Sequence, residues 1–173
     1  MISKDVLGPV ELYSVEMEET APGGPTRREL EREAVRRLVR AAFGPEAVLE
    51  HRADGSPIIA AAGELQISVS HSRHLAVLAV APTAVGVDIE EPREQLLRVA
   101  GRFMTPEEQR NYPTPELILK AWTLKEAAFK TLRPECPSTR MKLPPDECPY
   151  HIIYSGPHPV HPETFLSITI VAH

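Results

Sequence analysis

The fold of this chain is decided by residues 84–91, which read AVGVDIEE. Its valines are β-branched, and Gly86 allows another backbone to approach closely, so the stretch predicts a strand. Side chains alternate between the faces of a strand, which places Asp88 and Glu90 on the same face. Two adjacent carboxylates repel each other, and a hard divalent cation such as Mg2+ would offset that repulsion. A solvated strand end with two surface acids explains the same residues.

A second stretch, residues 121–130, reads AWTLKEAAFK. It is rich in strong helix formers and lacks Gly and Pro, so it predicts a helix. Trp122 and Phe129 fall near one face, and Glu126 and Lys130 are surface neighbours at i and i+4. An ordinary amphipathic helix with an exposed salt bridge is the alternative interpretation.

Together the two stretches resemble the paired signature of the 4′-phosphopantetheinyl transferases. That family has a G-[IVL]-D-[IVL]-E strand followed by W-x-x-K-E-[AS]-x-x-K on a helix, and the matching residues here are 86–90 and 122–130. The resemblance covers roughly residues 27–133. It implies an α/β (α+β) fold of two similar halves related by a pseudo-twofold, residues 1–84 and 85–173. In this respect the chain resembles the two-half, surfactin-synthetase-activating type of the superfamily.

The resemblance also implies a reaction, the transfer of 4′-phosphopantetheine from coenzyme A to a serine of an apo acyl or peptidyl carrier protein. The products would be the holo-carrier protein and adenosine 3′,5′-bisphosphate. The chemistry needs a neutralised pyrophosphate, a deprotonated serine and an aligned nucleophile. In the family pattern Asp88, Glu90 and Glu126 would hold Mg2+.

Four residues are expected to contact phosphates. Residues 70–72 read SHS after a predicted strand, and a turn histidine explains them locally. The family carries an S-H-[ST] motif ahead of its acidic strand that contacts the coenzyme A phosphates. The resemblance therefore assigns this role to Ser70 and His71, together with Lys125 and Lys130.

The nucleotide is expected to contact Arg32, with Arg36 behind it, on an arginine-rich helix predicted over residues 26–43. Arg32 best fits a family arginine that is followed by an Ala and a Leu. A solvated helix face with glutamate partners is the alternative. Ser56 stands where family members often have a lysine that contacts the adenosine phosphate, so that charge is lost unless other arginines compensate.

Glu108 supports two interpretations. Thr105 as N-cap, Pro106 at N1 and Glu108 at N3 predict a capping box that explains the glutamate completely. The family has a glutamate in an F-x-x-x-x-E pattern here, proposed as the base for the incoming serine. Glu108 fits that pattern, and Glu107 is adjacent.

The remaining pattern alternates between strands and helices. Strands are predicted over residues 10–16, 47–52, 65–70, 75–80, 150–154 and 165–171, and further helices over residues 93–103 and 114–132. The prolines cluster after Pro134, which predicts an irregular C-terminal region. Its histidines, His151, His158, His161 and His173, show no ligand spacing and favour a flexible tail or loop.

The bulk properties narrow the classes of function. The 173 residues, 42% of them apolar, suffice for one domain or two small halves. A net charge of −5 argues against nucleic acid as the partner. We see no signal peptide and no membrane span, and Cys136 and Cys148 fit no zinc or redox motif. These features predict reduced thiols in a cytoplasmic protein. The length of the chain predicts a monomer, because one chain can supply both halves of the site.

Two other functions stay open. A metal-dependent nuclease also uses Asp-x-Glu sites, but Pro92 stands two residues after Glu90 in place of a lysine. A degenerate transferase that binds a carrier protein or coenzyme A without chemistry is the second. The presence of all three expected metal ligands argues against it. The lysine missing at Ser56 argues for it, as do Glu16, Glu18 and Glu19 where the family often has basic residues before its first helix.

Overall fold

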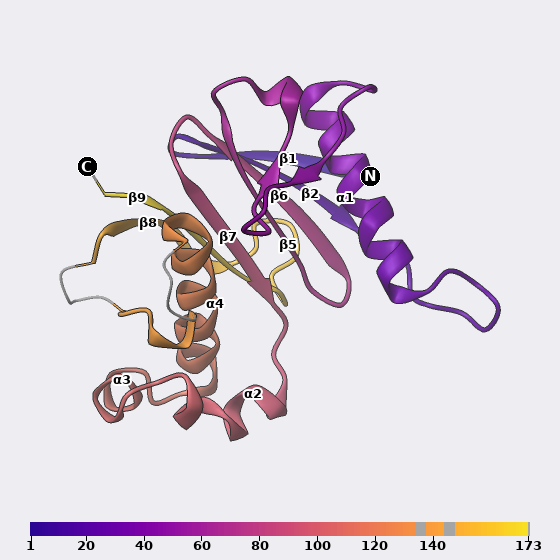
Figure 1. Ribbon diagram of the computed structural model, residues 1–173. Coiled ribbons are helices and arrows are strands. Elements are labelled where there is room, and N and C mark those ends of the chain that lie inside the picture. Colours follow the sequence, from indigo (N-terminus) through magenta and orange to yellow (C-terminus); the bar gives the residue numbers. More distant parts are fainter. Residues whose placement is uncertain (134–137, 144–147, 173) are drawn as a thin grey trace.

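The computed structural model describes residues 1–133, 138–143 and 148–172. Figure 1 shows its ribbon. The strands are β1 (Ile2–Leu7), β2 (Val10–Glu16), β3 (Glu50–His51), β4 (Pro57–Ile58), β5 (Gln66–His71), β6 (Leu75–Ala81), β7 (Val85–Glu90), β8 (Tyr150–Pro157) and β9 (Phe165–Val171). The helices are α1 (Arg27–Phe43), α2 (Glu94–Arg98), α3 (Pro106–Asn111) and α4 (Pro115–Leu132), with 3-10 turns η1 (Ala60–Ala62), η2 (Ala100–Arg102) and η3 (Ser138–Arg140).

Two antiparallel sheets form the body of the molecule. The first has the order β1-β2-β6-β5 and the second the order β7-β9-β8, while β3 and β4 form a small ribbon. All strands of the first sheet precede residue 84, and all strands of the second follow it. The predicted mixed α and β class is therefore confirmed, whereas the pseudo-twofold relation between halves stays a prediction.

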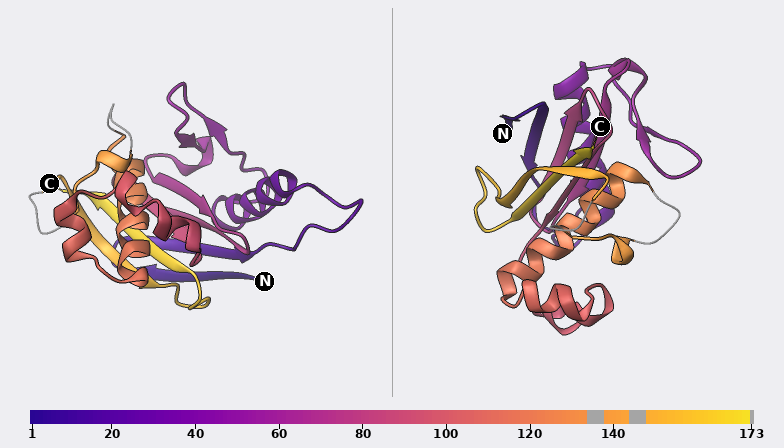
Figure 2. Two further views of the ribbon diagram at one scale, coloured as in Figure 1. Left: turned by 90° about the horizontal axis from the view of Figure 1, so that it is seen from below. Right: turned by 90° about the vertical axis from the view of Figure 1, so that its left-hand side faces the viewer.

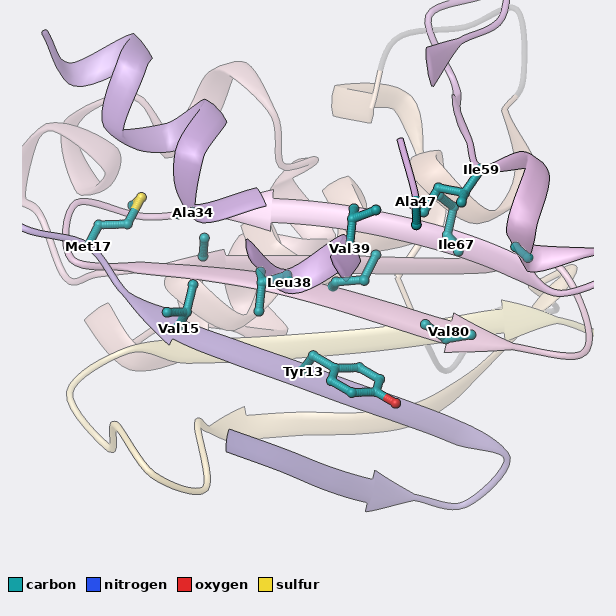
Figure 3. Packing of buried hydrophobic residues seen from close by; sticks show 13 residues of the cluster. Tyr13, Val15, Met17, Ala34, Leu38, Val39, Ala47, Ile59, Ile67 and Val80 are labelled. Atoms are coloured by element: carbon teal, nitrogen blue, oxygen red, sulfur yellow. The ribbon is translucent and has the colours of Figure 1, made fainter. Parts of the chain in front are cut away.

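Strand β6 lies between helix α1 and the second sheet, because both of its faces are apolar. Its sequence LAVLAVA is apolar on both faces, and every residue of it is buried. One face joins the cluster that α1 covers through Leu38 and Val39, as Figure 3 shows. The other face contacts Val87 and the second sheet. Helix α4 covers the far face of that sheet, so α1 and α4 lie on opposite sides of the sheets (Figure 2).

Serine side chains of β5 accept hydrogen bonds from backbone N–H groups on the open edge of β7. Ser68 Oγ accepts the backbone N–H of Val87 at 3.1 Å, and Ser70 Oγ accepts that of Ile89 at 3.3 Å. Both serines are buried, and their alternation in β5 leaves its apolar residues facing α1. A seam of side-chain hydrogen bonds therefore joins the two sheets where a backbone ladder is absent.

Helix starts are where the sequence predicts them. Thr26 and Glu29 form a capping box at α1, as do Thr105 and Glu108 at α3. The predicted helix over residues 93–103 is wrong in its extent, because α2 ends at Arg98 and a 3-10 turn follows. Strand β1 was not predicted, since its sequence ISKDVL mixes charged and apolar residues at the exposed edge of the sheet. No helix in the described ranges is long and apolar enough to cross a membrane.

The C-terminal region is more ordered than its prolines predict. Strands β8 and β9 pair through a register that spans Tyr150 to Pro157. His158 lies in the loop between β8 and β9, but it is only 1% exposed, so a loop is confirmed there and its predicted flexibility is not. Cys148 is a free thiol, while Cys136 and His173 lie outside the described residues.

Gly86 sets the separation between β7 and α4. A Cβ at this position would lie 1.9 Å from the carbonyl oxygen of Ala127 and 2.6 Å from Oγ1 of Thr131. The carbonyl belongs to the backbone of α4 and cannot move aside without moving the helix. The predicted close backbone approach at this glycine is confirmed.

We predict that Gly86→Ala destabilises the fold by roughly 3 kcal/mol or more, because helix and strand must separate to admit the methyl group. Gly101→Ala is the matched control, since a Cβ there meets only Nε2 of Gln109 at 3.9 Å. Urea unfolding of both variants measures the difference. Equal unfolding midpoints for Gly86→Ala and the unmodified protein would contradict the close approach.

His158 is locked in its neutral form. Its Nδ1 accepts the backbone N–H groups of Val160 and His161, each at 3.2 Å. Nε2 must therefore carry the proton, and it donates to Ser14 Oγ at 2.9 Å. Burial, followed by the nearby His161, lowers the pKa of His158 to about 4. The unfolded chain takes up this proton near pH 6.5, so it binds more protons than the native state between these values.

We predict that acidification from pH 7 to pH 5 costs about 2 kcal/mol of unfolding free energy through His158. His158→Gln should remove this part of the pH dependence, whereas His151→Gln, at an exposed position of β8, should retain it. Urea unfolding at the two pH values measures both. An unchanged pH slope in His158→Gln would show that the histidine is not held neutral.

Candidate functional site

A hollow of about 520 Å³ lies where the ends of β5 and β7 meet the start of α1. It is polar and rich in charged groups. Its lining is Arg27, Glu31, His71, Ser72, Arg73, Glu90, Glu91, Pro92 and Arg93. The SHS turn and the acidic strand, which are separate motifs in the sequence, therefore reach one cavity.

Arg27, the first residue of α1, fixes the turn that carries His71. It donates to the carbonyl of Arg73 at 2.5 Å and also to the carbonyl of Ser72. Glu31, one turn along α1, accepts from Arg27 Nε at 2.9 Å and lies 3.6 Å from Nδ1 of His71. His71 is exposed, so its imidazole is accessible to a ligand in the hollow.

Asp88 connects β7 to both β5 and α4. Its Oδ1 accepts Ser70 Oγ at 2.9 Å and Lys130 Nζ at 2.8 Å. Lys130 also donates to the carbonyl of Val87 at 2.9 Å. Asp88 is 7% exposed, and Lys130 is only partly buried. The structure thus brings Ser70, Asp88 and Lys130 together. Ser70 is buried and bonds to Asp88 inside the protein, whereas Lys130 remains partly accessible.

The other two predicted carboxylates are electrostatic neighbours of Asp88. Burial raises the pKa of Glu90, with Arg93 opposing the shift and Asp88 adding to it. Burial likewise raises the pKa of Glu126, which accepts Ser138 Oγ at 2.6 Å, and Asp88 again adds to the shift. Asp88 and Glu90 therefore share a face of β7 as predicted, and Glu126 on α4 faces the same region.

The donor set is chemically suited to Mg2+, because three mutually repelling carboxylates supply hard oxygen ligands. The described residues nevertheless contain no group of three or more His, Cys, Asp or Glu side chains arranged to hold a metal ion. Each carboxylate instead has a partner, Lys130 for Asp88, Arg93 for Glu90 and Ser138 for Glu126. Their chemistry fits the metal, and their side chains would have to leave these partners to converge on it.

Lys125 lies on a different side of α4 from Lys130. It is 1% exposed, and its Nζ donates to Glu108 Oε2 at 2.9 Å and to the carbonyl of Thr139 at 3.4 Å. The same Glu108 oxygen accepts the backbone N–H of Thr105 in the capping box. The structure thus joins Lys125 to Glu108 in a buried ion pair and places neither in the lining of the hollow.

Arg32 and Arg36 face a second hollow of about 450 Å³ between α1 and residues 47–51. The arginine of α1 that lines the first hollow together with His71 is Arg27, not Arg32 or Arg36. Sequence analysis did not single out Arg27 or Arg93 as site residues. The only signal for Arg27 was its place directly after the N-cap, where a side chain at the helix start reaches the neighbouring turn.

Comparison with known proteins gives a match over the segment that contains the acidic strand and α4. Residues 84–157 match the family model of the 4′-phosphopantetheinyl transferase superfamily. The matched segment includes Asp88, Glu126 and Lys130. It begins at residue 84, so the two-half type stays a prediction. No curated protein matches the chain.

We predict strong energetic coupling between Lys125 and Glu108. Breaking a buried ion pair leaves one charge without its partner and costs about 3–5 kcal/mol. Lys125→Met and Glu108→Gln should each be strongly destabilising, and the double variant should lose far less than their sum. The exposed pair of Glu94 and Arg98 is the control, with an expected coupling below about 0.5 kcal/mol. Additive losses at Lys125 and Glu108 in urea unfolding would show that the pair is not coupled.

Proposed function

We propose that this protein is a 4′-phosphopantetheinyl transferase, because residues 84–157 match the family model of that superfamily. It transfers 4′-phosphopantetheine from coenzyme A to a serine of an apo acyl or peptidyl carrier protein. The observation that carries the proposal is Asp88, held by Lys130 beside a hollow lined by arginines and a histidine. A site with this charge pattern is suited to a pyrophosphate.

The residues have distinct roles in this proposal. Lys130 and His71 bind the pyrophosphate oxygens, because both side chains carry N–H donors and both are at least partly exposed. Arg27 positions the His71 turn. Glu108 accepts the proton of the carrier serine, and Lys125 with Thr105 fixes its carboxylate. In this arrangement Lys125 acts on Glu108 rather than on a phosphate.

Asp88, Glu90 and Glu126 are the proposed ligands of Mg2+. When bound, the metal would supply positive charge next to the pyrophosphate. The ion pairs that these carboxylates now make supply the balancing charge within the protein itself. Lys130 and Arg93 would then be released to contact phosphate oxygens as their carboxylate partners turn to the cation.

We propose that the active unit is a monomer. The hollow takes Arg27, Glu31 and His71 from the part of the chain before residue 84. It takes Glu90 and Arg93 from the part after it. Because one chain supplies both sides, no second subunit is needed to complete the lining.

Asp88→Asn and Glu126→Gln should each slow transfer at least about a hundredfold, because each removes a proposed ligand of the Mg2+ that would supply positive charge next to the pyrophosphate. The protein is incubated with coenzyme A, Mg2+ and a panel of apo carrier proteins, and intact mass reports the added phosphopantetheine. Thermal melts without metal check that both variants fold. Glu94→Gln, an exposed acid of α2, is the control and should transfer at the unmodified rate.

Two outcomes would count against the proposal. Full activity in EDTA would remove the metal from the mechanism, and unmodified rates for Glu126→Gln would remove that carboxylate. Tight binding of coenzyme A without transfer to any carrier protein would instead favour a non-catalytic binding module.

A further inference from the structure

The serine seam between β5 and β7 continues beyond the ends of both strands. Serines stand at every second position of this segment, at residues 68, 70 and 72. The first two accept backbone N–H groups of β7. The third, Ser72, instead donates its hydroxyl to a side chain, Oε1 of Glu91, at 2.7 Å. All three bonds join residues that are 19 apart in the sequence, so Glu91 adds one more cross-strand bond in the same register.

The seam has a hollow at each of its ends. A third hollow, of about 150 Å³, lies at the first residues of β5 and β7, where Gln66 and Val85 are part of its lining. The other end opens on the hollow of about 520 Å³, and both Ser72 and Glu91 line it. The bond between Ser72 and Glu91 is therefore the outermost bond of the seam on the side of the proposed pyrophosphate site.

Glu91 also binds the turn that follows His71. Its Oε1 accepts the backbone N–H of His74 at 3.0 Å, and its Oε2 lies 3.9 Å from Nε2 of the same histidine. Arg27 donates to the carbonyl groups of residues 72 and 73 in this turn. An arginine of α1 thus binds the carbonyl groups of the turn, and a glutamate after β7 binds its N–H and hydroxyl groups. The turn is fixed to elements from both parts of the chain.

A carboxylate in the lining of an anion-binding hollow needs an explanation, because it repels phosphate. Asp88 and Glu90 have a proposed role as metal ligands, but Glu91 points to the other face of the strand. Within the described ranges its carboxylate contacts only Ser72 and His74. Its side chain is 21% exposed. These contacts indicate that Glu91 acts on the turn and not on a ligand.

We propose that Glu91 is a positioning residue that keeps His71 in place at the hollow, and this assignment rests on the proposed function. His71 directly precedes Ser72, and its side chain is 43% exposed. A turn that is already fixed before binding loses less conformational freedom when the imidazole contacts a phosphate oxygen. Glu91 touches no phosphate itself and affects binding only through His71.

The test measures coenzyme A binding by calorimetry on the full chain with Mg2+. His71→Ala should lower the affinity at least about tenfold, the loss expected for a hydrogen bond to a charged group. Glu91→Ala should lower it about threefold or more, because a smaller fraction of the molecules then presents His71 correctly. Ser72→Ala removes the same bond from the other side and should have a similar effect.

The double variant of His71→Ala and Glu91→Ala decides how Glu91 acts. It should bind coenzyme A no more weakly than His71→Ala alone, because Glu91 has no effect once the imidazole is gone. Additive losses in the double variant would overturn the assignment. So would unmodified affinity in both Glu91→Ala and Ser72→Ala.

Two further variants are controls. Glu91→Gln keeps an acceptor oxygen for Ser72 and His74, so it should bind coenzyme A as tightly as the unmodified protein. Glu19→Ala is matched in chemistry, because Glu19 pairs with Arg73 of the same turn at 3.8 Å, but both side chains are exposed. It should also keep the unmodified affinity. A loss in Glu91→Gln equal to that in Glu91→Ala would contradict a role through hydrogen bonds to the turn.

The NMR signal of the His71 imidazole separates this proposal from the proposed function, because it needs no ligand. In Glu91→Ala the signal should move toward the position of histidine in an unfolded peptide, whereas in Glu91→Gln it should stay. If it moves in this way while the unmodified protein binds no coenzyme A, the positioning of His71 is supported and the proposed function fails. If coenzyme A binds and the signal is the same in Glu91→Ala, the positioning role fails alone.

Discussion

The structure depends on the absence of a side chain at Gly86, where β7 crosses α4 at backbone distance. Because the two backbones are so close, the residues that follow Gly86 on the same face must meet the residues that follow Ala127 on the helix. Asp88 therefore meets Lys130 at 2.8 Å. Thr131 bonds across to Thr169 on β9, so the helix is fixed against both strands. The position of the charged groups follows from a packing constraint.

The hydrogen-bonded seam between the sheets determines where the polar groups lie. Backbone N–H groups on the edge of β7 need acceptors once they are buried, and the hydroxyls of β5 supply them. Hydroxyl groups take more room than a backbone ladder and can donate as well as accept. The Ser70 hydroxyl uses its donor for Asp88, which places a carboxylate at the centre of the seam and polar hollows at its ends.

Features that depend on a few neighbouring residues could be predicted from the sequence. The capping boxes at Thr26 and Thr105, the bounds of β9 and the close approach at Gly86 all belong to this group. Features that depend on distant segments could not be predicted. Periodicity did not reveal that Lys125 turns toward η3 while Lys130 turns toward β7, since both fit the helix equally well.

The same limit applies to the arginines of α1. The resemblance pointed to Arg32, but which arginine reaches His71 depends on where the turn after β5 lies. That turn is set by the pairing of β5 with β6, which is a tertiary contact. Likewise, the burial of His158 depends on Ser14 in a strand far away along the chain. Proline content alone therefore indicated disorder where a buried hydrogen bond holds the segment.

The double-sided burial of β6 has a consequence for synthesis on the ribosome. One face of this strand is covered by α1, which is made earlier, but the cover of the other face is completed only by Leu166 and Ile168, which are made much later. At typical elongation rates the strand waits roughly ten seconds for that cover. During this interval an uncharged, β-prone surface is open to other nascent chains. Until Leu166 and Ile168 are made, β6 is therefore the apolar strand of the nascent chain that is only partly covered.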